Sequence, residues 1–184
     1  MTEKPLYFIA LLPPEPIYSE VSELKKYMST EYGSKAGLRS PPHITLHMPF
    51  KIKEEKEHDL KASITELAQA TNPFTVYLNG FGHFRDRVIY IHIENSDELT
   101  LLFHSVNEVM KKVFNVFNSD YKNRGFNPHM TLAFRDLKKQ VFHNAWPEFE
   151  AKTFVKHFRA ESLCLLKHNG ESWGVYYKAP FIVR

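Results

Sequence analysis

The sequence predicts an α+β fold in which two lobes enclose a central cleft. Short apolar segments of strand length alternate with longer segments whose apolar residues recur at helical spacing. A five-residue phrase occurs twice, once in each half of the chain, at 42–46 and 128–132. No stretch rich in proline, glycine or serine separates the two halves. We therefore expect residues 1–184 to form a single two-lobed domain.

The first half is predicted to contain two strands and two helices. Residues 6–12 are a continuous apolar run closed by Pro13 and Pro14, which is typical of a buried strand. Residues 43–50 should form a second strand, and residues 51–70 a helix whose charged first turns face solvent. Apolar residues at helical spacing predict a helix between the two strands: Ile17, Val21, Leu24 and Met28.

The second half repeats this alternation. Asp97 is the expected cap of a long helix, whose apolar stripe includes Leu102, Val106, Met110, Val113 and Phe117. The segment 138–150 should be helical or irregular, with a break at Pro147. The remaining expected elements are strands at 74–78 and 88–93 joined by a hairpin-like connection, a polar loop at 118–127, and closing strands at 158–166 and 175–183.

Composition limits the classes of protein to consider. With 43% hydrophobic and 14% aromatic residues the chain can bury a core, so disorder is excluded. A net charge of +3 permits an anionic ligand but is weaker than expected for a protein that coats nucleic acid. The single cysteine, Cys164, lies in an apolar run and should be a buried core residue. No apolar run reaches membrane-spanning length and no secretory signal is seen, so we expect a cytoplasmic protein without a membrane partner.

The repeated phrase is the most specific feature of the chain. It reads Pro42-His43-Ile44-Thr45-Leu46 in the first half and Pro128-His129-Met130-Thr131-Leu132 in the second. Alternate side chains of a strand share one face, so each histidine should point the same way as the threonine two positions later. Two such strands facing each other would place two imidazoles and two hydroxyls in one cleft.

These residue types suit the hydrolysis of a phosphodiester. Histidine can take or give a proton near neutral pH, and the reaction needs both a base for the attacking oxygen and an acid for the leaving oxygen. Threonine hydroxyls can donate hydrogen bonds to the charged oxygens of the transition state. Two alternatives remain: the histidines are structural residues at strand ends, or His43, His47 and His129 form a three-histidine zinc site.

With these motifs the chain resembles the 2H phosphoesterase superfamily, which includes the RNA 2′,3′-cyclic phosphodiesterases once called 2′-5′ RNA ligases. Other similar segments are the strand at 7–11, Phe81-Gly82-His83-Phe84, and the closing strands with Tyr176 and Tyr177. The resemblance implies antiparallel sheets that line a central cleft, with helices on the outside. It also implies metal-independent catalysis by His43, Thr45, His129 and Thr131, with no cofactor. It assigns His43 as proton donor to the leaving oxygen and His129 as base, although the quasi-symmetric motifs are equally compatible with the reverse.

Several further residues are candidates for substrate binding. His47 lies four positions after His43 and, by strict alternation, on the same strand face, where it would contact a phosphate or base. Basic residues near the motifs would attract a phosphodiester, and Tyr90 offers an aromatic face for a base. The basic candidates are Arg39, Arg124 and Arg135.

The expected function is therefore a phosphodiesterase acting on a cyclic phosphate or a 2′-5′ linkage. The partner would be an RNA end or a small nucleotide, and the protein is assumed to be a monomer. The alternative from another class is a non-catalytic RNA- or nucleotide-binding module that retains the cleft. Intact histidines and threonines in both motifs favour the enzyme, because binding alone does not need two titrating groups.

Overall fold

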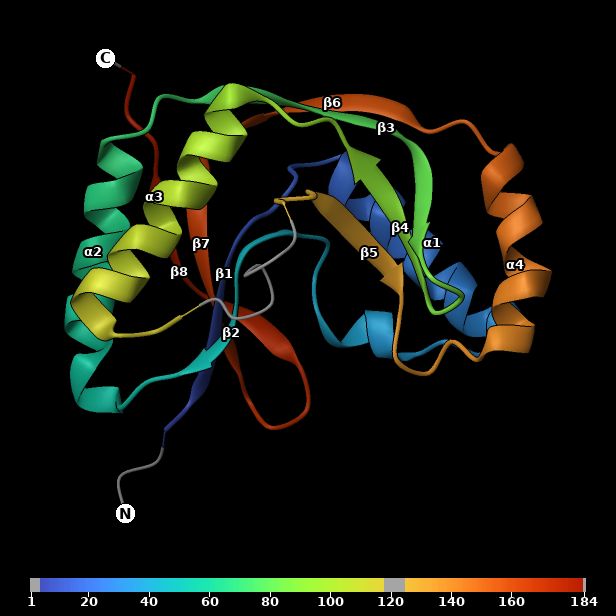
Figure 1. Cartoon of the computed structure of the whole chain (residues 1–184), viewed down its shortest axis with the longest axis horizontal. Helices are drawn as coiled ribbons and strands as arrows, with labels where there is room; N and C mark the ends of the chain where they lie inside the picture. The colour runs from blue at the N-terminus through green and yellow to red at the C-terminus, as the bar shows by residue number, and fades with distance from the viewer. Residues whose placement is uncertain (1–3, 118–124, 184) are drawn as a thin grey trace.

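The computed structural model describes residues 4–117 and 125–183, and within them two four-stranded antiparallel sheets are packed with four α-helices (Figure 1). The first sheet has the strand order β2-β1-β7-β8, and the second has the order β5-β4-β3-β6. The expected α+β fold, with antiparallel sheets on either side of a cleft and helices outside, is confirmed. The strands of the first sheet are β1 (Leu6–Leu11), β2 (Ile44–Lys51), β7 (Ser162–His168) and β8 (Trp173–Pro180). Those of the second are β3 (Phe74–Phe84), β4 (Val88–Ile93), β5 (His129–Ala133) and β6 (Val155–Ala160).

The helices are exchanged between the two sheets. α1, which follows β1, and α4 pack against the second sheet, whereas α2 and α3 pack against the first (Figure 1). The chain therefore crosses between the lobes before and after α1, and again on either side of α3. The bounds are α1 (Ile17–Tyr32), α2 (Glu57–Gln69), α3 (Asp97–Phe114) and α4 (Lys139–Ala151), with short 3₁₀ helices η1 (Ala36–Arg39) and η2 (Glu54–Lys56).

Several details of the elements differ from the sequence prediction. Ser96, not Asp97, caps α3, because its hydroxyl accepts a hydrogen bond from the Leu99 amide at 3.2 Å. Helix α4 continues through Pro147, which is exposed. The expected strand at 158–166 is two strands, since the chain leaves the second sheet as β6 and enters the first as β7 after Glu161. The stripe of α3 is shorter than expected, since two of its residues are each 55% exposed: Val113 and Phe117.

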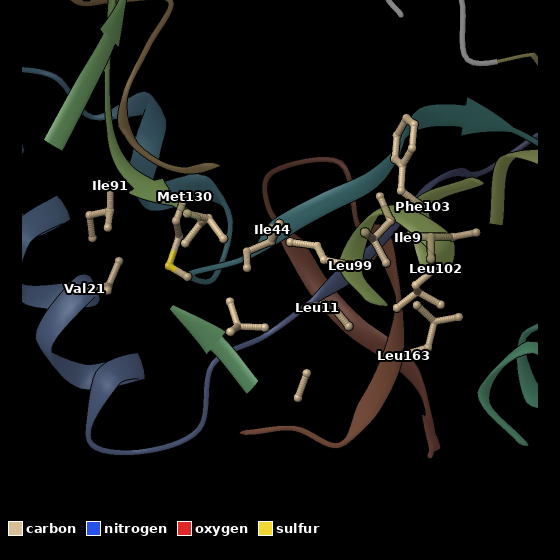
Figure 2. Packing of buried hydrophobic residues seen from close by; sticks show 14 of the residues in the cluster. Ile9, Leu11, Val21, Ile44, Ile91, Leu99, Leu102, Phe103, Met130 and Leu163 are labelled. Atoms are coloured by element: carbon tan, nitrogen blue, oxygen red, sulfur yellow. The ribbon is translucent and has the colours of Figure 1, made fainter. Parts of the chain in front are cut away.

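One hydrophobic core joins the two lobes and fixes the motif strands. Ile44 of β2 and Met130 of β5 are both fully buried in it, and Figure 2 shows them in a cluster that continues from Val21 of α1 to Leu163 of β7. β2 and β5 are the edge strands of their sheets, and they approach each other across this core. Burial alternates at the start of both strands, so the residues on either side of Ile44 and Met130 are turned away from the core.

The first sheet has an apolar surface on its other face as well. Phe8, Ala10, Cys164 and Leu166 form a smaller buried cluster there, against which Trp173 packs. Cys164 is 1% exposed, in agreement with its expected place among buried residues. This face of the sheet looks toward the cleft, because Phe8 and Trp173 also line the cavity described below.

The 3₁₀ helix η1 is packed tightly against the second motif strand. A Cβ atom on Gly37 would lie 2.2 Å from the carbonyl oxygen of Leu132, a distance that no packed atoms tolerate. Only glycine lets the η1 backbone approach β5 this closely.

We expect Gly37→Ala to lower the free energy of unfolding by about 1–3 kcal/mol, because η1 or β5 has to move to admit the methyl group. Urea unfolding followed by circular dichroism measures this difference. Gly125→Ala is the matched control, since a Cβ there meets no atom of the described residues within 4 Å. Equal stability of the two variants would contradict the tight contact.

Candidate active site

The two motifs meet in one cavity of about 320 Å³ between the sheets, here called the main cavity. His43 immediately precedes β2 and His129 is the first residue of β5, and each lines this cavity together with its threonine. The residues of the wall come from both lobes. Those of the motifs are His43, Thr45, His129 and Thr131. The sequence prediction that these four side chains share a cleft agrees with this arrangement.

Both histidines are held in the same tautomer by the backbone. Nδ1 of His43 contacts the carbonyl oxygen of Pro41 at 2.7 Å, and Nδ1 of His129 contacts that of Asn127 at 2.8 Å. A carbonyl oxygen can only accept, so Nδ1 carries the proton and donates in each case. In the neutral ring the lone pair is then on Nε2, which is the atom left to exchange a proton with a ligand.

Aromatic rings hold each imidazole in place. The His43 ring lies 4.7 Å from that of Phe8, and Phe8 in turn packs edge-on against Trp173 at 4.6 Å. The His129 ring lies 4.8 Å from Phe84. Because these surroundings are apolar, they disfavour an imidazolium ion.

The two histidines differ in electrostatic environment. Burial and, after it, the charge of Lys25 lower the pKa of His43 to about 3, against the opposing effect of the Pro41 hydrogen bond. Burial also lowers the pKa of His129, with the hydrogen bond to Asn127 acting in the opposite direction. Both imidazoles are therefore disposed to be neutral, and a bound anion would raise both pKa values.

Lys25 of α1 is a buried cation that the sequence prediction did not single out. Its side chain is 2% exposed, and its Nζ donates to the carbonyl oxygens of Ser40 at 3.0 Å and Pro41 at 3.2 Å. No described carboxylate lies within ion-pair distance of it. Burial lowers the pKa of Lys25 to about 8. The signal in the sequence was its position four residues after Val21, on the apolar face of the helix.

A carboxylate ties the segment after β5 to η1. Asp136 accepts hydrogen bonds from the Ser34 hydroxyl at 2.7 Å and from the amides of Lys35 and Ala36 at 2.8 Å each. Burial alone would raise the pKa of Asp136, but these hydrogen bonds outweigh it and lower the pKa. These hydrogen bonds hold the segment that carries Arg39 against the segment that carries Arg135. Both arginines line the main cavity.

Of the candidate substrate-binding residues, Arg39 and Arg135 lie in the wall of the main cavity. Arg135 has a φ of 61°, a left-handed backbone conformation that only a few per cent of non-glycine residues adopt and that tends to occur at functional sites. Tyr90 is not in the wall: its ring packs against His129 at 5.1 Å and Phe84 at 4.4 Å, as a support behind them. Arg124 lies outside the described residues.

His47 does not reach the cavity, so the expectation of strict alternation was wrong here. The pairing of β1 with β2 shifts between Tyr7 and Ile9 and again between Ile9 and Ala10, which places His47 opposite Ile9 rather than in phase with Thr45. His47 is 1% exposed and packs edge-on against Phe50, and its Nε2 atom has no hydrogen-bond partner among the residues that the structure describes. Within residues 4–117 and 125–183 no cluster of side chains suited to a metal ion forms, so the three histidines considered as a zinc site are not brought together.

The sequence prediction missed a third histidine in the wall of the main cavity. His168, at the end of β7, lines it beside Trp173, with the two rings 4.9 Å apart. The Gly170 amide donates to Nδ1 of His168 at 3.1 Å, so the neutral ring carries its proton on Nε2. In the neutral ring the Nε2 atom of His168 is therefore a hydrogen-bond donor, whereas Nε2 of each motif histidine is an acceptor. No local sequence pattern indicates that His168 lies near the motifs, because pairing of β7 with β1 in the first sheet brings the β7–β8 hairpin to the site.

A second cavity of about 350 Å³, here called the side cavity, adjoins the main one. The two share Arg39, Ser40 and Trp173 as a common wall. Tyr18 and Lys26 of α1 also line the side cavity. Among the described lining residues of both cavities the charged side chains are lysines and arginines, with no aspartate or glutamate, so the whole site favours an anionic ligand.

Comparison with protein families gives a match over most of the chain. A family model described as the 2′-5′ RNA ligase superfamily matches residues 13–172. A protein of Bacillus cytotoxicus that is provisionally named a phosphoesterase is 34% identical over 127 residues, which are 68% of this chain and 67% of that protein. A protein of the same provisional name from Bacillus cereus is 32% identical over 126 residues, 67% and 66% of the two chains.

Solved structures share the fold over nearly the full length. The TT0787 protein of Thermus thermophilus has a TM-score of 0.70 and 22% identity, with 96% of this chain and 97% of that one covered. LigT of Escherichia coli, crystallised with 3′-AMP, has a TM-score of 0.67 and 19% identity, with 98% and 100% covered. At these identities the likeness establishes the fold. No helix in the described part of the chain is long and apolar enough to cross a bilayer.

Burial of Lys25 predicts a pH-dependent difference in stability between the wild type and Lys25→Met. The folded protein releases this proton at a pKa of about 8, whereas the unfolded chain holds it to the ordinary value of 10.5. Between these values the unfolded state binds more protons, so the stability of the wild type should rise with pH relative to the variant. Urea unfolding at several pH values from neutral to alkaline measures the difference, with Lys26→Met as control. A difference that stays constant over this range would contradict the burial of a charged Lys25.

Proposed function

Because the chain belongs to the 2′-5′ RNA ligase superfamily, within the 2H phosphoesterases, we propose that it is a phosphodiesterase that hydrolyses a 2′,3′-cyclic phosphate at an RNA end or on a nucleotide. The observation that carries the proposal is that two histidines with an unprotonated Nε2 line one cavity, each together with the threonine of its own motif. The main cavity, at about 320 Å³, is at the small end of ligand sites and suits a single nucleotide. LigT, which shares the fold, was crystallised with 3′-AMP, a ligand of this class.

The proposed reaction uses water as the nucleophile. One imidazole accepts a proton from the water as its oxygen attacks phosphorus, and the other imidazole, in its protonated form, gives a proton to the leaving ribose oxygen. One P–O bond forms, one breaks, and the product is a phosphomonoester with a free hydroxyl. The two histidines then exchange protons with solvent to restore the starting forms.

The remaining side chains of the main cavity stabilise charge. Thr45 and Thr131 line the cavity and would donate hydrogen bonds to the non-bridging oxygens, which gain charge as water attacks. The guanidinium groups of Arg39 and Arg135 would offset the charge of the phosphate. His168 adds a donor through Nε2.

Each motif histidine should be required for turnover. We expect His43→Ala and His129→Ala each to lower kcat by about 100-fold or more, the usual contribution of a general acid or base. His104→Ala, an exposed histidine of α3, is the control. The assay uses a panel of nucleoside 2′,3′-cyclic phosphates, 2′-5′ dinucleotides and cyclic ADP-ribose phosphates, with the products identified by mass spectrometry and phosphorus NMR.

The same panel separates the enzyme from the alternative of a non-catalytic binding module. Tight binding of RNA ends without product would support the module and overturn the proposal. Turnover should persist in EDTA, and a complete loss that zinc restores would overturn the metal-independent mechanism. Near-full activity of both alanine variants would show that the site is elsewhere.

The side cavity favours an RNA end over a free mononucleotide as substrate. It adjoins the main cavity at Arg39 and Trp173, and its Lys26 and Tyr18 offer a cation for a second phosphate and a ring for a second base. A nucleotide preceding the cyclic phosphate in the strand could therefore occupy it.

We expect a dinucleotide that ends in a 2′,3′-cyclic phosphate to have a kcat/KM about tenfold above that of the nucleoside 2′,3′-cyclic phosphate, since one base stack is worth about 1–3 kcal/mol. Tyr18→Ala and Lys26→Ala should each reduce this ratio. Steady-state kinetics on the two substrates measures it. A ratio near one in the wild type, or a ratio unchanged in both variants, would contradict binding in the side cavity.

A further inference from the structure

We propose that His168 selects the base of the terminal nucleotide, favouring a base that presents a carbonyl oxygen over one that presents an amino group in its place. This inference rests on the proposed function and narrows its substrate to a cyclic phosphate of uridine or guanosine at the reacting end. It follows from three features of the structure: the place of His168 in the main cavity, the apolar side chains around it, and a proton held on its Nε2 atom.

His168 and His43 belong to opposite ends of the first sheet, although both line the main cavity (Figure 1). The start of β2, which directly follows His43, pairs with β1 at Leu11, and the end of β7, which contains His168, pairs with β1 at Tyr7. These two positions are about 13 Å apart along an extended strand. A phosphate held between the motif histidines therefore leaves the His168 end of the cavity to another part of the nucleotide.

The side chains near His168 suit a nucleobase. Phe8 and Trp173 form this part of the wall, with Met48 and Pro49 beside Phe8 in the neighbouring strand. Aromatic rings stack on bases, and an apolar wall with a few polar groups is typical of a ligand site. The polar groups of these five side chains are the imidazole of His168 and the indole N–H of Trp173, and the indole can only donate a hydrogen bond.

The second lobe supplies another apolar part of the wall, but the side cavity favours the first lobe for the base. The apolar residues of the second lobe are Phe84, Val88 and Phe134. Trp173 lies between the main cavity and the side cavity, which we assign to the preceding nucleotide. Because consecutive nucleotides of a strand are neighbours, the terminal base is expected beside Trp173 and hence beside His168.

The turn that follows β7 holds the imidazole of His168 as a donor. The Gly170 amide donates to Nδ1 at 3.1 Å, which leaves the proton of the neutral ring on Nε2. The side-chain oxygen of Asn169 fixes this turn, since it accepts from the amides of Glu171 at 3.0 Å and Ser172 at 2.8 Å. The ring of His168 also packs against that of Trp173 at 4.9 Å. A base beside this ring therefore meets an N–H group and not a lone pair.

Hydrogen bonds on the other face of the first sheet hold the end of β7 in place. Lys167, the residue before His168, donates to the carboxylate of Glu57 in α2 at 2.7 Å. The same carboxylate accepts hydrogen bonds from the hydroxyls of Tyr7 in β1 and Tyr176 in β8. One side chain thus connects three neighbouring strands to α2. Because its strand is fixed in this way, His168 can present its N–H group without a rearrangement of the sheet.

A donor at this place separates the bases into two groups. Uracil and guanine carry a carbonyl oxygen where cytosine and adenine carry an amino group. The carbonyl oxygen can accept the hydrogen bond from Nε2 of His168, whereas the amino group would oppose one donor to another. A site built to hydrogen-bond a ligand rejects an analogue that leaves its polar group unpaired. We therefore expect His168 to favour uracil over cytosine and guanine over adenine.

The test compares nucleoside 2′,3′-cyclic phosphates in two matched pairs, uridine with cytidine and inosine with adenosine. The members of each pair share their ring system, and one carries the carbonyl oxygen where the other carries the amino group. For the wild type we expect kcat/KM to be about tenfold higher for the carbonyl member of each pair, the effect of one hydrogen bond whose donor is otherwise left unpaired. Steady-state kinetics on the four compounds measures both ratios.

Two variants of His168 should remove the preference. The amide of His168→Gln can present either a donor or an acceptor, and His168→Leu presents neither, so both ratios should fall to near one. The fall should come mainly from the uridine and inosine compounds. His157→Gln, at an exposed histidine of β6, is the control and should keep the wild-type ratios. If circular dichroism shows that His168→Leu folds poorly, His168→Gln decides.

The other outcomes overturn the selection of the base. An equal fall in kcat/KM for all four compounds in the His168 variants would show that this residue contacts the ribose or the phosphate, or only supports the hairpin. Wild-type ratios near one would show that no such selection exists. A wild-type preference that persists in both variants would assign it to another part of the wall, such as the apolar residues of the second lobe.

Binding measurements keep this inference separate from the proposed function. Titration calorimetry with uridine and cytidine 2′-monophosphates measures the preference without turnover. Tighter binding of the uridine compound that His168→Gln abolishes, with no turnover of any cyclic phosphate, would overturn the proposed function alone. Turnover of all four cyclic phosphates at equal kcat/KM would overturn the role of His168 alone. Failure of both monophosphates to bind, together with no turnover, would overturn both.

Discussion

The burial of Ile44 and Met130 in one core is the constraint on which the site depends. Each residue follows a motif histidine directly and is fully buried. Because neighbouring side chains of a strand point to opposite faces, burying these two turns the histidine and threonine on either side toward the cavity. The close contact of Gly37 with the Leu132 carbonyl and the hydrogen bonds to Asp136 then fix η1 against the second motif strand.

The electrostatics of the site follow from the residues that surround the two motif strands. Aromatic rings enclose both imidazoles, and the charged residues described in the two cavities are cationic. Such a site destabilises protonated histidine until an anion enters. In the proposed mechanism the ligand supplies the charge that activates the acid.

The repeated phrase allowed the fold class and the four motif residues to be predicted, because strand alternation fixes the relation of His43 to Thr45 and of His129 to Thr131. The same rule failed for His47, where two shifts in the pairing of β1 with β2 change the phase, and no glycine or proline at these positions of β1 signals them. Lys25 lies four positions after Val21, on the apolar face of the helix, but a charged residue at such a position does not by itself indicate burial. His168 and Trp173 could not be placed, since their approach to the motifs depends on pairing between strands far apart in the sequence.

The exchange of helices between the sheets bears on how a ligand enters. α1 leaves the first sheet to pack on the second, and α3 leaves the second to pack on the first. Neither lobe is thus a contiguous piece of chain, and moving the lobes apart would expose the shared core that contains Ile44 and Met130. Because the shared core holds the lobes together, we expect a ligand to enter between side chains of the cavity wall, Trp173 among them. The same interlocking means that a duplicated half of this chain would not fold by itself into one lobe.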